Sequence, residues 1–85
     1  MRFGPYLAAA LEKAGHSQSS FAAKVKYQQQ NINQIIKGRR APALKRVDAW
    51  ATLLAKHIDR ETFLDLAHLA HASERIQKLV DKLRS

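Results

Sequence analysis

The chain has 85 residues, enough for one small domain that buries a modest core without a disulfide or a metal. It has no cysteine, which excludes a disulfide scaffold and a zinc finger, and no apolar run reaches the ~20 residues of a membrane-spanning helix. The net charge is +8, and residues 1–42 hold seven basic residues against one acid, which predicts a polyanion-binding face in the first half and a packing or association module behind it.

The pattern along the chain predicts helices throughout. The two prolines and three glycines stand where helices would begin or end, and no alternating apolar pattern marks a strand. The first helix is expected to begin at Pro5 and to end at a left-handed Gly15. Its buried face is formed by Leu7, Ala10, Leu11 and Ala14.

Two short helices follow. Ser17 is a suitable N-cap for the second helix, which is expected to end near Lys26 and Tyr27. The third helix is expected over residues 28–37, with Gly38 ending it. The inward positions of this pair are Phe21, Ala22, Val25, Ile32 and Ile35.

The second half of the chain predicts two or three further helices. Pro42 is expected to open the fourth, with Leu44, Val47, Ala51 and Leu54 on its buried side and Trp50 near the edge of that stripe. Asp59 is a plausible N-cap for the fifth. A heptad seam then runs through Leu66, Leu69, Ser73, Ile76, Val80 and Leu83.

Two continuations of this seam are open. One helix could span residues 60–84, or the chain breaks or kinks near Ser73, which we prefer and which would create a sixth helix. The expected fold is therefore all-α and compact, with five helices or six.

The third helix carries an unusual outward face. Above its two isoleucines stand amides rather than the Glu and Lys of an ordinary solvated helix. An amide offers a donor and an acceptor side by side, which matches the N6 and N7 edge of adenine in the major groove. Basic residues follow directly and can hold phosphates, and Gln18 can offer its side chain or backbone N–H to another. The expected DNA-binding residues are Gln18, Gln28, Gln29, Gln30, Asn31, Asn33, Gln34, Lys37, Arg39 and Arg40.

Three stretches carry a family resemblance: SQSSFAAKV at 17–25, QQNINQI at 29–35 and KGRRAP at 37–42. Together they resemble the Cro/C1-type (XRE) helix-turn-helix family, most like lambdoid phage repressors and Cro, over about residues 5–70. The resemblance implies a five-helix lambda-repressor-like fold that binds operator DNA as a dimer and regulates transcription. It implies base reading by Gln29, Gln30 and Gln34, phosphate contact and bracing of the third helix by Gln18, and backbone or minor-groove contact by Arg39 and Arg40.

The sequence departs from the family pattern at three positions. Lys26 stands where the family usually has the glycine of the turn, so either a strained left-handed lysine or a different turn is expected. Ile36 stands where glutamate is common, and is expected to pack against a neighbour or lie at a subunit contact. Gln28 replaces the usual Ser or Thr N-cap.

We therefore predict a helix-turn-helix DNA-binding domain over residues 1–70 and a helical extension over 71–85. Two roles for the extension are weighed equally: packing on its own subunit, or dimerisation. The dimerisation residues would be Ile76, Leu79, Val80 and Leu83.

The predicted function is a dimeric regulator, most simply a repressor, on an inverted-repeat operator in the cytoplasm of a bacterium or a phage-infected cell. The alternatives are an antitoxin-type module that also binds a protein through residues 60–85, a controller of a restriction–modification or prophage operon, and a non-specific nucleic-acid-binding protein. We expect no enzyme, because no nucleophile–base set is present and the acid pair Asp59/Glu61 suits a helix start. No cofactor and no membrane partner are expected, and no metal, because His68 and His71 have no further ligand at suitable spacing.

Overall fold

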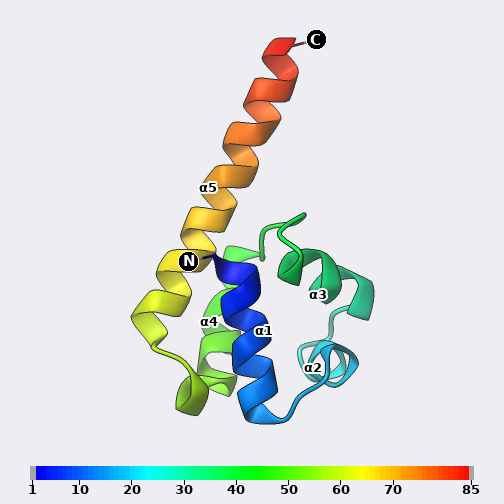
Figure 1. The fold of residues 1–85 in the computed structure, drawn as a ribbon, viewed down its shortest axis with the longest axis vertical. Coiled ribbons are helices and arrows are strands. Elements are labelled where there is room, and N and C mark those ends of the chain that lie inside the picture. The colour runs from blue at the N-terminus through cyan, green and yellow to red at the C-terminus, as the bar shows by residue number, and fades with distance from the viewer. Residues whose placement is uncertain (1, 85) are drawn as a thin grey trace.

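The computed structural model describes residues 2–84 and shows a helical bundle with a projecting tail (Figure 1). The extents of 43 × 25 × 21 Å reflect the length of the last helix, whose second half stands clear of the bundle. The elements are α1 (Phe3–Ala14), α2 (Gln18–Lys24), α3 (Gln29–Ile36), α4 (Leu44–Leu53), a 3-10 turn η1 (Ala55–His57) and α5 (Arg60–Arg84). The expected all-α fold is confirmed, in its five-helix form.

The core joins apolar side chains from all five α-helices. Phe21 of α2 meets the Trp50 ring of α4 edge-on, with the ring centroids 5.5 Å apart. Phe63 of α5 meets Phe3 of α1 in the same way at 5.0 Å. The predicted core positions Leu7, Ala10, Leu11, Phe21, Ala22, Val25, Ile32, Ile35, Val47, Ala51, Leu54 and Leu66 are all buried.

Local signals at the helix ends act as expected. Ser17 caps α2 by accepting the Ser20 N–H at 3.0 Å, and Asp59 accepts the Thr62 N–H at 3.1 Å at the start of α5. Gly15 and Gly38 end α1 and α3 in the left-handed conformation, with φ of 75° and 77°. Their backbone N–H groups and those of the next residues donate to the last helical carbonyls, which satisfies groups that would otherwise lack partners.

The expected starts of two helices are wrong by two residues. Helix α1 begins at Phe3, and Pro5 lies within the first turn, where its missing N–H has no helical acceptor to serve. Helix α4 begins at Leu44, and Pro42 is buried in the loop before it. Because Leu44 is the first residue of α4, its side chain lies at the helix end and is exposed instead of joining the buried stripe. Trp50, expected near the edge of that stripe, is instead 1% exposed at its centre.

Helix α5 is continuous, so the preferred break near Ser73 is wrong. No glycine or proline follows Pro42, and residues around Ser73 such as Ala72, Glu74 and Arg75 have helix propensity that a single serine does not overcome. A straight helix cannot return to its own domain. The alternative in which the apolar stripe of the extension folds back on its own subunit is therefore also wrong, since Ile76 and Leu83 are 62% and 79% exposed.

A glycine sets how closely α1 approaches α3. A Cβ built on Gly4 would lie 2.2 Å from the carbonyl oxygen of Ile36, which is closer than any real contact of that kind. The absent side chain lets the start of α1 lie directly against the end of α3. Gly4 therefore helps to place α3, although sequence reasoning treated it only as a residue before a helix.

Candidate DNA-binding surface

Helices α2 and α3 form a compact pair joined by four residues, and α3 packs on both α1 and α2. Ile32 and Ile35 are 0% and 2% exposed, which anchors one side of α3 in the core. The other side faces solvent. Of the predicted DNA-binding amides, Gln28, Gln29 and Gln30 are exposed and Gln18, Asn31, Asn33 and Gln34 are half-buried.

The turn between α2 and α3 uses a left-handed lysine. Lys26 has φ 61°, and the N–H groups of Lys26 and Tyr27 donate to the carbonyls of Ala23 and Ala22. This is the hydrogen-bonding pattern seen after Gly15 and Gly38, here built without glycine. Of the two expectations for this turn, the strained left-handed lysine is the one observed.

The ring of Tyr27, directly after Lys26, packs the turn against the core. The Tyr27 ring meets the Trp50 ring edge-on at 5.2 Å between centroids. The Arg46 guanidinium lies over the same Tyr27 ring, 5.4 Å from the ring centroid. Packing around Tyr27 thus stabilises a turn whose lysine is unfavourable by itself.

A side-chain hydrogen bond joins the first residue of α2 to the middle of α3. The Nδ2 of Asn33 donates to the Oε1 of Gln18 at 3.0 Å. The amide donor of Asn33 is thereby engaged inside the protein, whereas no such bond holds Gln29, Gln30 or Gln34. Gln18 and Asn33 act as a brace between the two helices, as the family resemblance implies for Gln18.

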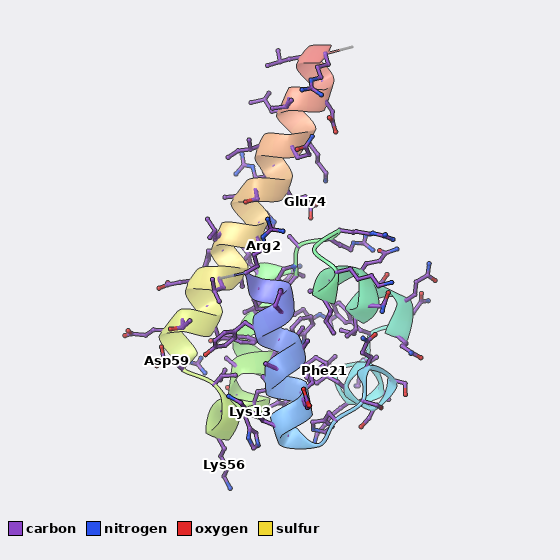
Figure 2. The ribbon with its side chains drawn as sticks, in the orientation of Figure 1. Arg2, Lys13, Phe21, Lys56, Asp59 and Glu74 are labelled. Carbon is purple, nitrogen blue, oxygen red and sulfur yellow. The ribbon has the colours of Figure 1, made fainter. Side chains whose placement is uncertain are left out.

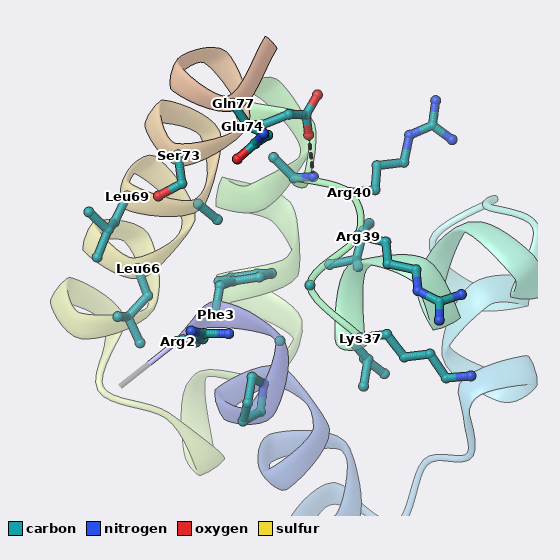
Figure 3. Close-up of a pocket in the computed structure, with 17 residues that line it drawn as sticks. Arg2, Phe3, Lys37, Arg39, Arg40, Leu66, Leu69, Ser73, Glu74 and Gln77 are labelled. Carbon is teal, nitrogen blue, oxygen red and sulfur yellow. Dashed lines mark hydrogen bonds between the residues drawn. The ribbon is translucent and has the colours of Figure 1, made fainter. Parts of the chain in front are cut away.

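Basic side chains occupy the loop that follows α3. Lys37, Arg39 and Arg40 are exposed and extend from this loop on the side away from α5 (Figure 3). The guanidinium of Arg40 also donates to Oδ1 of Asn31 at 3.1 Å, so this loop folds back over the start of α3. The positive charges therefore border the row of amides.

An acidic residue from the distant tail fixes that same loop. The Oε2 of Glu74 accepts the Ala41 N–H at 2.6 Å, and Glu74 also pairs with Lys78 at 3.2 Å. Figure 2 places Glu74 where α5 leaves the bundle. The hydrogen bond from Ala41, and then Lys78, hold the pKa of the Glu74 carboxyl below its ordinary value. The two partners are 33 positions apart, and nothing in the local sequence signals this contact.

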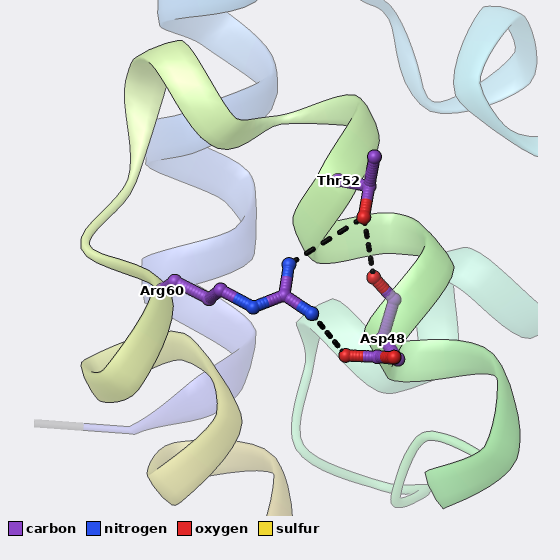
Figure 4. Close-up of polar contacts among 3 residues, drawn as sticks. All are labelled: Asp48, Thr52 and Arg60. Atoms are coloured by element: carbon purple, nitrogen blue, oxygen red, sulfur yellow. Dashed lines mark hydrogen bonds and ion pairs between the residues drawn. The ribbon is translucent and has the colours of Figure 1, made fainter.

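Several polar side chains away from this surface form structural contacts. Asp48 of α4 pairs with Arg60 of α5, and Arg60 also donates to Thr52, which ties the two helices together (Figure 4). Hydrogen bonds from the Thr62 hydroxyl and N–H lower the pKa of Asp59. In residues 2–84 no three His, Asp or Glu side chains gather as a metal site would require.

Ile36 and Gln28, the other two departures from the family pattern, have plain structural outcomes. Ile36 is half-buried and packs against the core, which is the first of the two expectations for it. Gln28 precedes α3 without a side-chain cap, so the first N–H groups of α3 receive no such partner.

A cleft of about 660 Å³ lies between the start of α1, the loop after α3 and α5 (Figure 3).

The arrangement defines a class of protein: a helix-turn-helix in which an anchored second helix presents polar side chains to solvent, as DNA-binding domains of this type do. The helix-turn-helix family model matches residues 7–60, well over half of the chain. The chain therefore belongs to the Cro/C1-type helix-turn-helix family, and it is a DNA-binding regulator of that type.

Proteins of this helix-turn-helix family bind DNA to regulate it and are usually not enzymes. No curated protein and no solved structure matches the chain. Within residues 2–84, no helix combines the length and the apolar character needed to cross a bilayer.

Proposed function

We propose that the protein is a sequence-specific regulator, most simply a repressor, that binds an inverted-repeat operator as a dimer. The observation that carries this proposal is the row of amides on the solvent side of α3, above the buried Ile32 and Ile35. A surface of this composition is suited to hydrogen-bonding base edges and poorly suited to any purely structural role.

The residues are proposed to make two kinds of contact with DNA, one to base edges and one to phosphates. Gln29, Gln30 and Gln34 are proposed to read bases, each able to make a bidentate contact with adenine that discriminates by ~1–3 kcal/mol. Lys37, Arg39 and Arg40 would neutralise phosphates and fix the register. The remaining amides would support them at the rim of the same surface: Gln18, Gln28, Asn31 and Asn33.

Two copies of the motif are needed because half-sites repeat after about 34 Å along one face of the duplex. In each copy we assign residues 1–70 to the DNA-binding domain and 71–85 to a helical extension. Because the ligand is genomic or phage DNA, the proposed site of action is the cytoplasm of a bacterium, with the gene carried by the cell or by a phage.

Selection from a pool of random duplexes tests the proposal. The wild-type protein should enrich a short inverted repeat, and Gln29→Ala/Gln30→Ala should lose that preference while keeping salt-sensitive background binding. Gln77→Ala is the matched control, because Gln77 is an exposed glutamine on α5 and not on α3, and should leave the selected repeat unchanged. Random output from the wild type would contradict the proposal and indicate a non-specific binder.

A further inference from the structure

The projecting half of α5 carries an apolar stripe with nothing over it. The stripe repeats at alternating spacings of three and four residues, the spacing of a two-stranded coiled coil. Four of its large side chains are 56–79% exposed. We call this surface the tail stripe; it consists of Leu69, Ala72, Ile76, Leu79 and Leu83.

The tail stripe faces away from the domain that bears it. Ala67 is 0% exposed against the core, and Ile76 follows nine residues later, which is two and a half turns of an α-helix. The two side chains therefore leave α5 in opposite directions. Glu74 lies near the bundle side and bonds to Ala41, which holds the base of the tail in this orientation. The domain cannot cover its own tail stripe.

This register differs from the heptad seam predicted from the sequence. That seam ran through Leu66, which is buried in the bundle, and included Ser73 and Val80. In the structure Leu79 belongs to the exposed stripe, while Val80 is half-buried at its flank. Of the predicted dimerisation residues, Ile76, Leu79 and Leu83 lie in the tail stripe and Val80 lies at its border.

We propose that the tail stripe is the docking surface for a second copy of this chain, aligned in parallel as a short coiled coil. This proposal rests on the proposed dimeric function and names the surface, the register and the direction of the contact. Isoleucine at one core position and leucine at the next is the combination that favours two parallel strands, and Ile76 and Leu79 supply it.

The charges beside the tail stripe favour the parallel direction. One flank is basic, with Arg75 and Lys82 each one residue before a stripe position, and the other flank is neutral, with Ser73 and Val80. In a parallel pair the basic flank of one copy lies against the neutral flank of the other. In an antiparallel pair like flanks meet, which would set Arg75 against Lys82 of the second copy and repel.

The geometry also suits two DNA-binding heads. The tail stripe spans 15 residues, about 21 Å of helix, and a parallel pair places both bundles at the same end of it. Covering the four exposed large side chains on both copies removes of the order of 1,000 Å² from water, the lower limit for a specific association. We therefore expect a reversible dimer whose population rises with protein concentration.

Sedimentation of the full chain without DNA tests the surface. The wild type should shift from the mass of one chain toward that of two as concentration rises. Ile76→Lys should abolish that shift. Gln77→Lys introduces the same side chain one residue along, about 100° round the helix and outside the tail stripe, and should leave the shift intact. A wild type that stays monomeric at every concentration, or a dimer that survives Ile76→Lys, overturns the proposal; capture of a different protein by a monomeric chain would identify that protein as the occupant instead.

Cysteine cross-linking tests the direction, and the chain offers a clean background because it has no cysteine. In a parallel pair Leu83→Cys lies beside its own counterpart and should form a disulfide on mild oxidation. Asp81→Cys, on the outer side of the same turn, should not. Leu83→Cys dimers that never cross-link overturn the parallel arrangement. Neither experiment contains DNA, so both outcomes are independent of whether α3 reads bases.

Discussion

Lys26 adopts the left-handed conformation, with φ 61°, in the turn between α2 and α3. The family usually has glycine at this position. A non-glycine residue in this region is unfavourable by on the order of 1 kcal/mol, because its Cβ crowds the following carbonyl. Tyr27, packed on Trp50, holds the chain in the turn. The strain at one residue is thus balanced by aromatic packing at the next.

Lys26→Gly should therefore stabilise the protein. Relief of the crowding outweighs the added freedom of glycine in the unfolded chain, and we expect a gain of up to about 1 kcal/mol, or a rise in Tm of several degrees. Thermal unfolding followed by circular dichroism measures it. Lys24→Gly, at the last residue of α2, where the backbone is helical, should lower Tm instead. A lower Tm for Lys26→Gly as well would show that the lysine side chain itself stabilises the turn.

At the scale of elements, Glu74 links α5 to the loop that follows α3. Glu74 accepts the Ala41 N–H, and the loop it holds also carries Arg39 and Arg40. Its pKa is lowered first by this hydrogen bond and then by Lys78. A carboxylate with a lowered pKa in the folded state stabilises the fold above its ordinary pKa, and this stabilisation is lost as the pH falls through the lowered value.

Glu74→Gln tests the contribution of this charge, because glutamine retains an oxygen that can accept the Ala41 N–H. At pH 7 we expect the variant to be less stable by about 1 kcal/mol after allowance for solvent screening, seen as a lower Tm. As the pH falls through the lowered pKa of Glu74, the wild-type advantage should disappear. A Tm difference that remains undiminished in acid would mean that the carboxylate charge is not its source.

At the scale of the whole molecule, the net positive charge is concentrated in the half of the chain that contains the amides. Residues 1–42 contribute seven of the fifteen basic residues but only one of the seven acids, and they include α3 and its basic loop. The second half carries most of the acids and forms the supporting helices and the tail. The chain thus separates the half that we propose to face DNA from a supporting half.

This separation predicts the salt dependence of operator binding. Removing one phosphate contact should reduce the slope of log affinity against log salt by about 0.9, so Arg39→Ala in a dimer should reduce it by about 1.8. Lys56→Ala, at the foot of the bundle away from α3 (Figure 2), should leave the slope unchanged. The slope is read from operator titrations between about 50 and 200 mM salt. Equal slopes for the wild type and Arg39→Ala would show that Arg39 does not contact a phosphate.

What could be predicted from the sequence follows from interactions over a few residues. The caps at Ser17 and Asp59, the left-handed glycines and the two inward isoleucines of α3 depend on helical periodicity and nearby hydrogen bonds. The outward row of amides follows from the same periodicity. The prolines did not fix the first residue of α1 or α4, because Pro5 and Pro42 are compatible with several positions near a helix start. The packing of neighbouring segments determines where each helix begins.

The tertiary structure alone decided how the site is held. The Gln18–Asn33 brace spans 15 positions, Gly4 meets Ile36 across two helices, and the bond from Ala41 to Glu74 spans 33. Only the packed bundle brings such residues together, since the fit of whole helices sets these distances. The direction of the tail stripe also depends on tertiary packing. One face of α5 is buried in the core, so the tail stripe lies on the other face.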